Sequence, residues 1–156
     1  MATHSPEDRL KELGLVLPQA PKPVASYIPT RRSGDLVFVS GQIPIADGEL
    51  LAKGSVPSRT APESAIACAR RCTLNALACL KAEIGDLSRV SGVVKVGVFV
   101  ASEPGFGDQP KIGNACSDLL VEVFGQDIGQ HARAAVGVSA LPLDVPVEIE
   151  FIFEVT

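Results

Sequence analysis

The chain has 156 residues, and 46% of them are apolar, which is enough for one buried core. A formal net charge of -4 leaves no basic surface for a phosphate backbone, so nucleic acid is not expected as a main partner. The longest apolar runs are strand-sized, and the N-terminus is acidic where a signal peptide would be basic. We therefore expect a soluble, cytoplasmic protein without a membrane partner.

The first predicted element is a short amphipathic helix that Ser5 can cap, with Asp8 as its capping-box partner and Gly14 as its end. A proline-rich segment follows and is expected to be extended. We therefore assign residues 1–23 to a helical extension and linker, and residues 24–156 to the main domain.

The next part of the chain predicts a strand, a loop and a long helix. A turn at residues 33–35 feeds a strand that ends by residue 42, and residues 45–60 are typical of a loop. Residues 61–85 predict the clearest helix, which Gly85 ends. Its inward stripe is expected to consist of Ile66, Thr73, Leu77, Leu80 and Ile84.

Three of the four cysteines, Cys68, Cys72 and Cys79, fall within this helix, and the fourth is Cys116. No histidine stands near the three in the helix, so a metal site is not expected. Thiols of a cytosolic protein in such positions are usually small apolar fillers between a helix and a sheet. We predict this packing role for all four.

The second half of the chain predicts a buried strand at residues 93–100, a glycine-rich loop at 101–110, a helix at 111–125, and strands at 133–140 and 147–155. In the last strand, alternation places one set of side chains in the core: Val147, Ile149, Phe151, Phe153 and Val155. Two helices that each follow a strand favour an α+β two-layer sandwich, with both helices on one face of the sheet.

The face of the sheet without helices would carry charged and small residues. Alternation places Lys95, Arg133, Glu148, Glu150 and Glu154 there. Self-association around a symmetry axis is the simplest cover for such a face. Because an unpaired guanidinium in an apolar strand is costly, we expect Arg133 either to bind an anion in a pocket of small residues or to pair with one of the glutamates.

No motif for a metal, a phosphate, a dinucleotide or a serine-hydrolase elbow occurs in the sequence, and no cofactor is expected. The two histidines, His4 and His131, are far apart in the sequence, so a Ser-His-Asp enzyme is not supported. His131 lies two residues before Arg133 and could carry a proton, although a surface histidine at the start of a strand is the more common situation.

Three motifs stand in register over most of the chain: SGQIP, VVKVGVFV and the block R-x-x-V…LP…VEIE. With them, the sequence after about residue 24 resembles the RidA/YjgF family of small trimeric reactive-intermediate deaminases. Tyr27 stands thirteen residues before Ser40, and Glu148 stands fifteen after Arg133, as the corresponding residues do in that family. The main domain is therefore interpreted as RidA/YjgF-like.

The resemblance implies a fold similar to the Bacillus-type chorismate mutase, with a mixed sheet, assembled as a homotrimer whose pockets lie between subunits. The uncovered sheet face would then line an inner barrel. It also implies the hydrolysis of 2-imino or 2-enamino acids to 2-keto acids and ammonia. Such a reaction needs no cofactor, because an imine hydrolyses readily once water and substrate are held together.

The resemblance also assigns roles to residues. Arg133 would bind the substrate carboxylate through paired N–H bonds, and Glu148 would orient or deprotonate the attacking water. The substrate-binding positions that the family implies are Tyr27, Ser40, Gly41, Asn114 and Ala135. Asn114 would lie where the second helix opens.

Two features depart from the well-characterised deaminases. His131 and Ala132 occupy the places shortly before the arginine where a proline is usual, and Ala135 stands where a cysteine or polar residue is usual. The N-terminal helix and the longer loop at residues 101–110 resemble a longer branch of the family that is often described as endoribonuclease-like.

The leading hypothesis from the sequence is an enamine/imine deaminase that acts on reactive products of pyridoxal-phosphate enzymes. The alternative is a non-catalytic protein that binds or senses a small carboxylate, which needs Arg133 but not Glu148. A ribonuclease would need a general acid–base pair and a cationic groove, and this acidic sequence does not indicate either.

Overall fold

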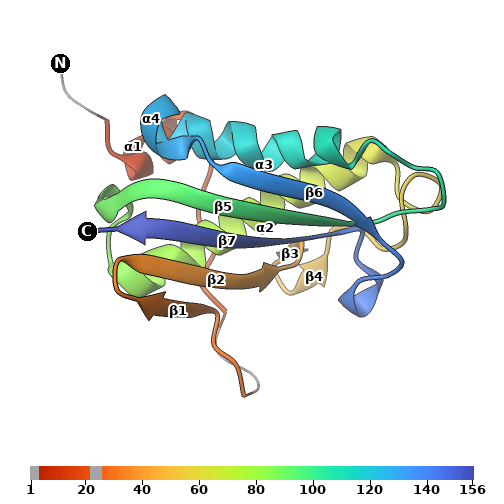
Figure 1. Cartoon of the computed structure of the whole chain (residues 1–156), viewed down its shortest axis with the longest axis horizontal. Coiled ribbons are helices and arrows are strands. Elements are labelled where there is room, and N and C mark those ends of the chain that lie inside the picture. Colours follow the sequence, from red (N-terminus) through yellow and green to blue (C-terminus); the bar gives the residue numbers. More distant parts are fainter. Residues whose placement is uncertain (1–3, 22–25) are drawn as a thin grey trace.

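The computed structural model of the chain describes residues 4–21 and 26–156. Its centre is a five-stranded sheet with the strand order β1-β2-β7-β5-β6 (Figure 1). The strands are β1 (Thr30–Ser33), β2 (Leu36–Gln42), β5 (Val90–Ala101), β6 (Ala132–Val138) and β7 (Val147–Val155). The predicted boundary between extension and domain, at residues 23 and 24, lies outside the described residues.

The sheet is mixed. Strands β5 and β6 are parallel, because helix α3 (Gln109–Phe124) carries the chain back between them, whereas the other neighbours are antiparallel. In β7, which lies between β2 and β5, the five side chains predicted to be in the core are at most 1% exposed. The α+β sandwich that the sequence predicts is therefore confirmed.

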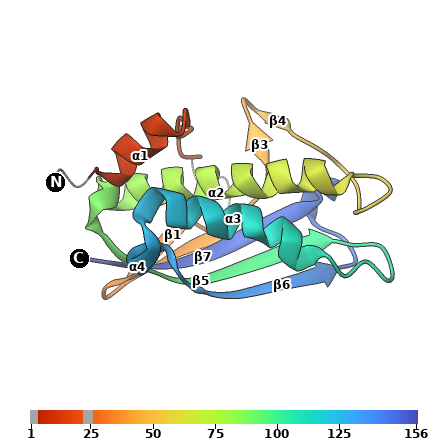
Figure 2. The ribbon, with the colours of Figure 1, turned by 90° about the horizontal axis from the view of Figure 1, so that it is seen from above.

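Helices α2 (Pro62–Ile84) and α3 both lie on one face of the sheet, as predicted (Figure 2). Helix α2 ends at Gly85, whose φ of 86° is a left-handed conformation that favours glycine. No helix in the described ranges is long and apolar enough to cross a membrane.

Four residues of the predicted α2 stripe, Thr73, Leu77, Leu80 and Ile84, are buried as predicted, and Ile66 is the exception. Ile66 is 39% exposed, whereas Ala65, Ala69, Cys72 and Ala76 are fully buried. These small side chains allow the helix to pack closely on its neighbours. All four cysteines are buried, and burial raises the pKa of the Cys116 thiol to about 12. The packing role predicted for the cysteines agrees with this placement.

The N-terminal helix α1 (Pro6–Glu12) is built as predicted, because Ser5 and Asp8 form a reciprocal capping box. The helix packs on the rest of the molecule through Leu10, which is 3% exposed. Glu7 accepts a hydrogen bond of 3.0 Å from the backbone N–H of Leu87 and lies 3.4 Å from the ammonium of Lys81. The extension is therefore anchored by apolar, hydrogen-bond and charge contacts.

The structure adds elements that the sequence analysis does not predict. The expected loop at 45–60 contains a hairpin of β3 (Ile45–Ala46) and β4 (Glu49–Leu50), and α4 (Gln126–Gly129) follows α3. Asp47 and Gly48 form the hairpin turn with φ values of 52° and 83°, the sign that the common two-residue hairpin turn requires. The short strand β1 pairs with β2 and forms one edge of the sheet.

Candidate functional site

Arg133 lies on the helix-covered face of the sheet, and not on the open face as the sequence analysis predicts. It pairs with the buried Val96 in the parallel ladder, and its side chain meets α3. The alternation of β6 is inverted relative to the prediction, since Val136 is 44% exposed. Gly113 of α3 approaches Arg133 and Ala135 so closely that an added Cβ would lie 3.2 Å and 3.5 Å from them. The small residues of β6 therefore accommodate the helix.

The Arg133 guanidinium contacts only neutral oxygens within the described chain. Its Nη1 donates to Asn114 Oδ1 and to Ser117 Oγ, both at 3.0 Å, and its Nη2 donates to the Pro110 carbonyl at 3.4 Å. No carboxylate of the described residues lies within 4.0 Å of it. A structural ion pair with a glutamate of the same chain, the alternative that the sequence left open, is therefore not formed.

Asn114 reaches Arg133 from inside α3. The helix begins at Gln109, two residues before the predicted start, so Asn114 lies in its second turn and does not open it. Ser117 follows one turn later on the same side of the helix, which lets both side chains contact one guanidinium. The sequence analysis does not identify Ser117, although its spacing of three from Asn114 places it on the face of α3 turned to Arg133.

His131 is tied into the same group of side chains. Its Nδ1 lies 2.7 Å from the Gly129 carbonyl, which only accepts, so this nitrogen carries the proton. Its Nε2 then accepts from Ser117 Oγ at 2.9 Å. Burial lowers the pKa of His131, and the charge of Arg133 lowers it further. The residue is half-buried and is not the free surface histidine that the sequence favours.

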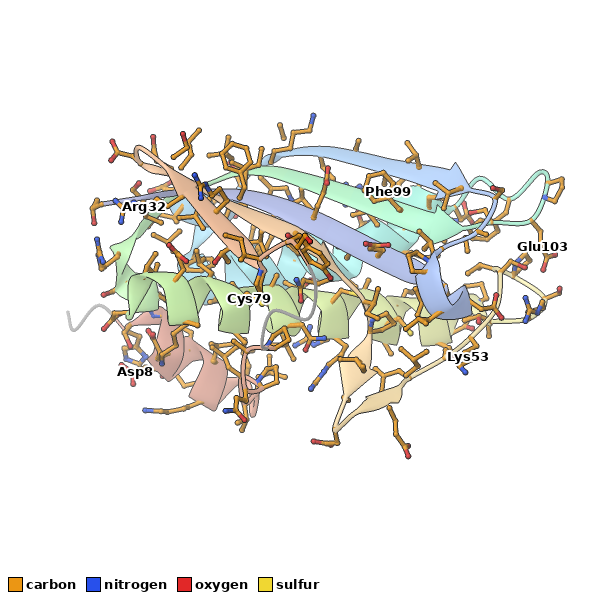
Figure 3. The ribbon with its side chains drawn as sticks, turned by 90° about the horizontal axis from the view of Figure 1, so that it is seen from below. Asp8, Arg32, Lys53, Cys79, Phe99 and Glu103 are labelled. Atoms are coloured by element: carbon orange, nitrogen blue, oxygen red, sulfur yellow. The ribbon has the colours of Figure 1, made fainter. Side chains whose placement is uncertain are left out.

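Glu148 lies on the opposite face of the sheet. It pairs across the ladder with Phe99, which in turn pairs with Val136, and Figure 3 shows Phe99 on the side of the sheet turned away from α2. Burial raises the pKa of Glu148, and the neighbouring Glu150 charge adds to the rise. No cation of the described residues lies within 4.0 Å of this carboxylate.

Gly41 lies against Glu148, Ser40 is its neighbour in β2, and Tyr27 borders the same cavity as Gly41. Gly41 is indispensable there, because a Cβ would collide with the Glu148 carboxylate. Ser40 donates through Oγ to the Ile28 carbonyl at 2.9 Å, and this bond fixes the segment that carries Tyr27. Tyr27 itself is 61% exposed. Ser40 and Gly41 belong to an irregularity in the β2–β7 pairing, which interrupts the ladder at this point.

The predicted site therefore consists of two separate groups. The arginine cluster contains Asn114, Ser117, His131, Arg133 and Ala135, and the glutamate cluster contains Tyr27, Ser40, Gly41 and Glu148. Strand β5 lies between their strands, so β6 and β7 are about 10 Å apart, and the two key side chains leave the sheet on opposite faces. One chain does not bring Arg133 and Glu148 together.

Each cluster borders a cavity. A groove of about 680 Å³ runs along the arginine cluster and is lined by Ser117, His131, Arg133 and the acidic residues Asp118 and Glu122, among others. A second cavity of about 740 Å³ lies beside Tyr27 and Gly41. The described residues contain no group of three or more His, Cys, Asp or Glu side chains placed to hold a metal ion.

A family model described as "YjgF/chorismate mutase-like, putative endoribonuclease" matches residues 7–154. Protein TCP17 of Trypanosoma cruzi is 40% identical over 93% of this chain and 91% of its own length. The 2-iminobutanoate/2-iminopropanoate deaminase of Dermatophagoides farinae is 31% identical over 86% of this chain and 90% of its own length.

The fold is also similar to that of solved structures. The crystal structure of the protein Atu1372 from Agrobacterium tumefaciens, described as having unknown function, superposes with a TM-score of 0.90 at 43% identity. The match covers 97% of this chain and 92% of that one, so it includes the region of the N-terminal helix.

Proposed function

Because the chain belongs to the YjgF/chorismate mutase-like family, we propose that it is an enamine/imine deaminase, which hydrolyses 2-imino and 2-enamino acids to 2-keto acids and ammonia. The observation that carries the proposal is the arginine cluster, in which a guanidinium at a groove has neutral partners only. The deaminase named in Dermatophagoides farinae supports the choice of reaction.

Arg133 is suited to bind the carboxylate of the substrate. Its present acceptors are an amide, a hydroxyl and a backbone carbonyl, and a carboxylate forms stronger, charge-assisted bonds with the same N–H groups. The planar fork can bind both carboxylate oxygens at once, which a lysine ammonium cannot do. Asn114 and Ser117 hold the guanidinium in place before the substrate arrives.

Glu148 is suited to act on water. Its raised pKa makes it a stronger base than an ordinary carboxylate, and no described cation neutralises it. In the proposed reaction, a water oxygen bonds to carbon 2 of the imine while Glu148 takes one of its protons. Glu148 returns this proton to nitrogen, which gives a tetrahedral adduct with one hydroxyl and one amino group on carbon 2. The hydroxyl proton then passes through Glu148 to the amino group, the carbon–nitrogen bond breaks as the carbon–oxygen double bond forms, and ammonia leaves a 2-keto acid. The reaction as written needs no cofactor.

The opposite placement of the two clusters requires assembly. We propose a homotrimer in which the arginine cluster of one subunit meets the glutamate cluster of its neighbour. The open face of the sheet supports self-association, because Phe38 and Val136 are 41% and 44% exposed there, and Phe99, between Val136 and Glu148 in the ladder, is only half-buried. The binding partners of the protein would then be its own copies and a small carboxylate, and the proposed location is the cytoplasm.

The deaminase proposal is tested with 2-iminopropionate generated in situ by an amino-acid oxidase. Semicarbazide traps the imine that remains, so an active deaminase suppresses the trapped product. We expect suppression by the wild type and its loss in Arg133→Ala and Glu148→Ala. Arg133→Lys keeps the charge but not the fork and should lose about 10- to 100-fold in kcat/KM. Arg32→Lys on the edge strand β1 is the matched control.

Two other readings are outcomes of the same experiment. Folded wild type that does not suppress trapping, yet melts at a higher temperature with a 2-keto acid bound at Arg133, would make the protein a carboxylate-binding or sensing module. Endoribonuclease activity is suggested by the wording of the family description. The net charge of -4 and the acidic residues in the Arg133 groove oppose RNA binding. RNA cleavage that persists in both variants would indicate a contaminating nuclease.

A further inference from the structure

The cavity of about 740 Å³ beside β2 has a polar wall that the proposed deaminase does not use. It is enclosed by residues 16–21, the segment of Tyr27 and Pro29, the end of β2, the β3–β4 hairpin and helix α2. Neither Arg133 nor Glu148 lines it. Figure 2 shows the hairpin and α1 on the side of α2 turned away from the sheet. The cavity therefore adjoins the glutamate cluster through Tyr27 and Gly41, but its Arg71 and Asn75 wall is separate from both key residues of the proposed reaction.

Arg71 supplies a fixed positive charge to this cavity. Its Nε donates to the Ile45 carbonyl at 2.8 Å, which holds the guanidinium plane in place. The terminal Nη1 and Nη2 groups have no hydrogen-bond or ion-pair partner within the described part of the chain. Asp47 also lines the cavity but does not come within 4.0 Å of the guanidinium. The free end of Arg71 is the geometry that binds a carboxylate through two N–H bonds.

Asn75 supplies an acceptor one helical turn away. The residue is 5% exposed, and its Nδ2 donates to the carbonyls of Ile43 and Ile45 at 3.0 Å and 3.1 Å. Both partners only accept, so the amide nitrogen must point toward them. The Oδ1 atom has no hydrogen-bond partner among the described residues. Every described side-chain polar atom that is sealed from solvent does have a partner, so Oδ1 must be open to solvent. This oxygen therefore faces the cavity that Asn75 lines.

The remaining walls are apolar and incompletely covered. Val16, Tyr27 and Ile45 all line the cavity and are 83%, 61% and 38% exposed. Large apolar side chains that are exposed together around a concave site are typical of small-molecule sites, as is a volume of several hundred cubic ångströms. A ligand with an apolar body would cover them.

We propose that this cavity binds an apolar carboxylate that carries a hydrogen-bond donor on carbon 2, such as a 2-hydroxy or 2-amino acid with a branched aliphatic side chain. Arg71 binds the carboxylate, and Asn75 Oδ1 accepts from the donor. The two residues are four apart on one helix, so their Cβ atoms are about 5–6 Å apart and the two ligand groups must be close neighbours. The apolar body lies against Tyr27 and Ile45.

The chain offers a direct probe, because Tyr27 is its single tyrosine and it has no tryptophan. Tyrosine emission is titrated with 2-hydroxy-4-methylpentanoate. We expect a saturable change whose Kd rises about 10- to 100-fold in Arg71→Gln, the loss expected for a charge-assisted bond. Arg70→Gln is the matched control, since Arg70 is the neighbouring arginine and does not line the cavity. Arg133→Ala must also retain binding, which excludes the proposed reaction site as its location.

Two ligand controls use the unaltered protein and so do not depend on the folding of a variant. The uncharged 2-hydroxy-4-methylpentanamide should bind as weakly as the acid binds to Arg71→Gln. The acid without a donor, 4-methylpentanoate, should bind about 3- to 10-fold more weakly, the effect of one hydrogen bond. Absence of saturable binding at millimolar acid, equal binding of acid and amide, or loss of binding in Arg133→Ala would each overturn the proposal, whatever the outcome of the deaminase assay.

Discussion

Glu148 and Gly41 show how one backbone position sets the place of a functional side chain. Glu148 has a raised pKa because it is half-buried, and the missing side chain of Gly41 leaves it the space it occupies. A carboxylate that is partly removed from water without a cation destabilises the fold, so its retention is explained better by a reaction than by packing. Two predictions distinguish a role of Glu148 in the reaction from a role in packing.

Gly41→Ala is expected to displace the Glu148 carboxylate, because the new Cβ would overlap it. We expect deaminase activity to fall at least about 10-fold, and the free energy of unfolding in urea to fall by about 1–3 kcal/mol. In a Glu148→Ala background the collision is absent, so Gly41→Ala should then cost much less stability. Equal costs in the two backgrounds, measured as a double-mutant cycle, would contradict this explanation.

Glu148→Gln is expected to stabilise the protein at neutral pH. The folded-state pKa is raised above the ordinary value of 4.5, so the unfolded chain loses this proton at lower pH than the folded chain does. The stability of the wild type therefore falls as pH rises above about 4.5, and the penalty is absent at lower pH. Melting temperatures should be higher for Glu148→Gln at pH 7 and nearly equal at about pH 3.5. Glu49→Gln, an exposed position in β4, should show no such difference.

At the level of elements, the sequence predicts the buried face of a strand most accurately where large apolar side chains alternate with polar ones. Strand β7 has five large apolar residues on one face, and each of them is buried. Strand β6 has only small residues next to Arg133 in the sequence, and such residues occur equally well against a helix or against solvent. The sequence analysis therefore assigned the two faces of β6 the wrong way round. In α2, the large Ile66 was placed in the core although the small Ala65 and Ala69 are the buried residues in that turn. The Arg133 contacts could not be predicted, because they depend on the closeness of α3 to β6.

This closeness can be tested at Gly113, which lies inside α3 and faces Arg133. Alanine in a helix is favoured over glycine by up to about 1 kcal/mol, so Gly113→Ala should leave the free energy of unfolding unchanged or higher. The added Cβ would be 3.2 Å from Arg133 Nη1 and should move the guanidinium by a few tenths of an ångström. We expect KM for the imine to rise several-fold while stability is retained. A loss of stability together with unchanged KM would show that α3, and not the Arg133 side chain, moves to accommodate the new Cβ.

At the level of the whole molecule, the fold separates the residues that the proposed reaction must combine. Arg133 and Glu148 leave different strands on opposite faces, and no rearrangement of side chains joins them within one sheet. Assembly is therefore part of the proposed mechanism. Light scattering should give three times the subunit mass of 16.3 kDa, and a monomer would remove the proposed site altogether.

Mixed assemblies test the shared site directly. Arg133→Ala and Glu148→Gln are each expected to be inactive, but a trimer that contains both has interfaces where an intact Arg133 of one subunit meets an intact Glu148 of the next. If subunits combine at random, about one quarter of the interfaces are complete, so co-refolded variants should recover about a quarter of the wild-type activity. The same variants refolded separately and mixed without exchange are the control. If both residues served a site within one subunit, every subunit would carry one defect and co-refolding would restore nothing.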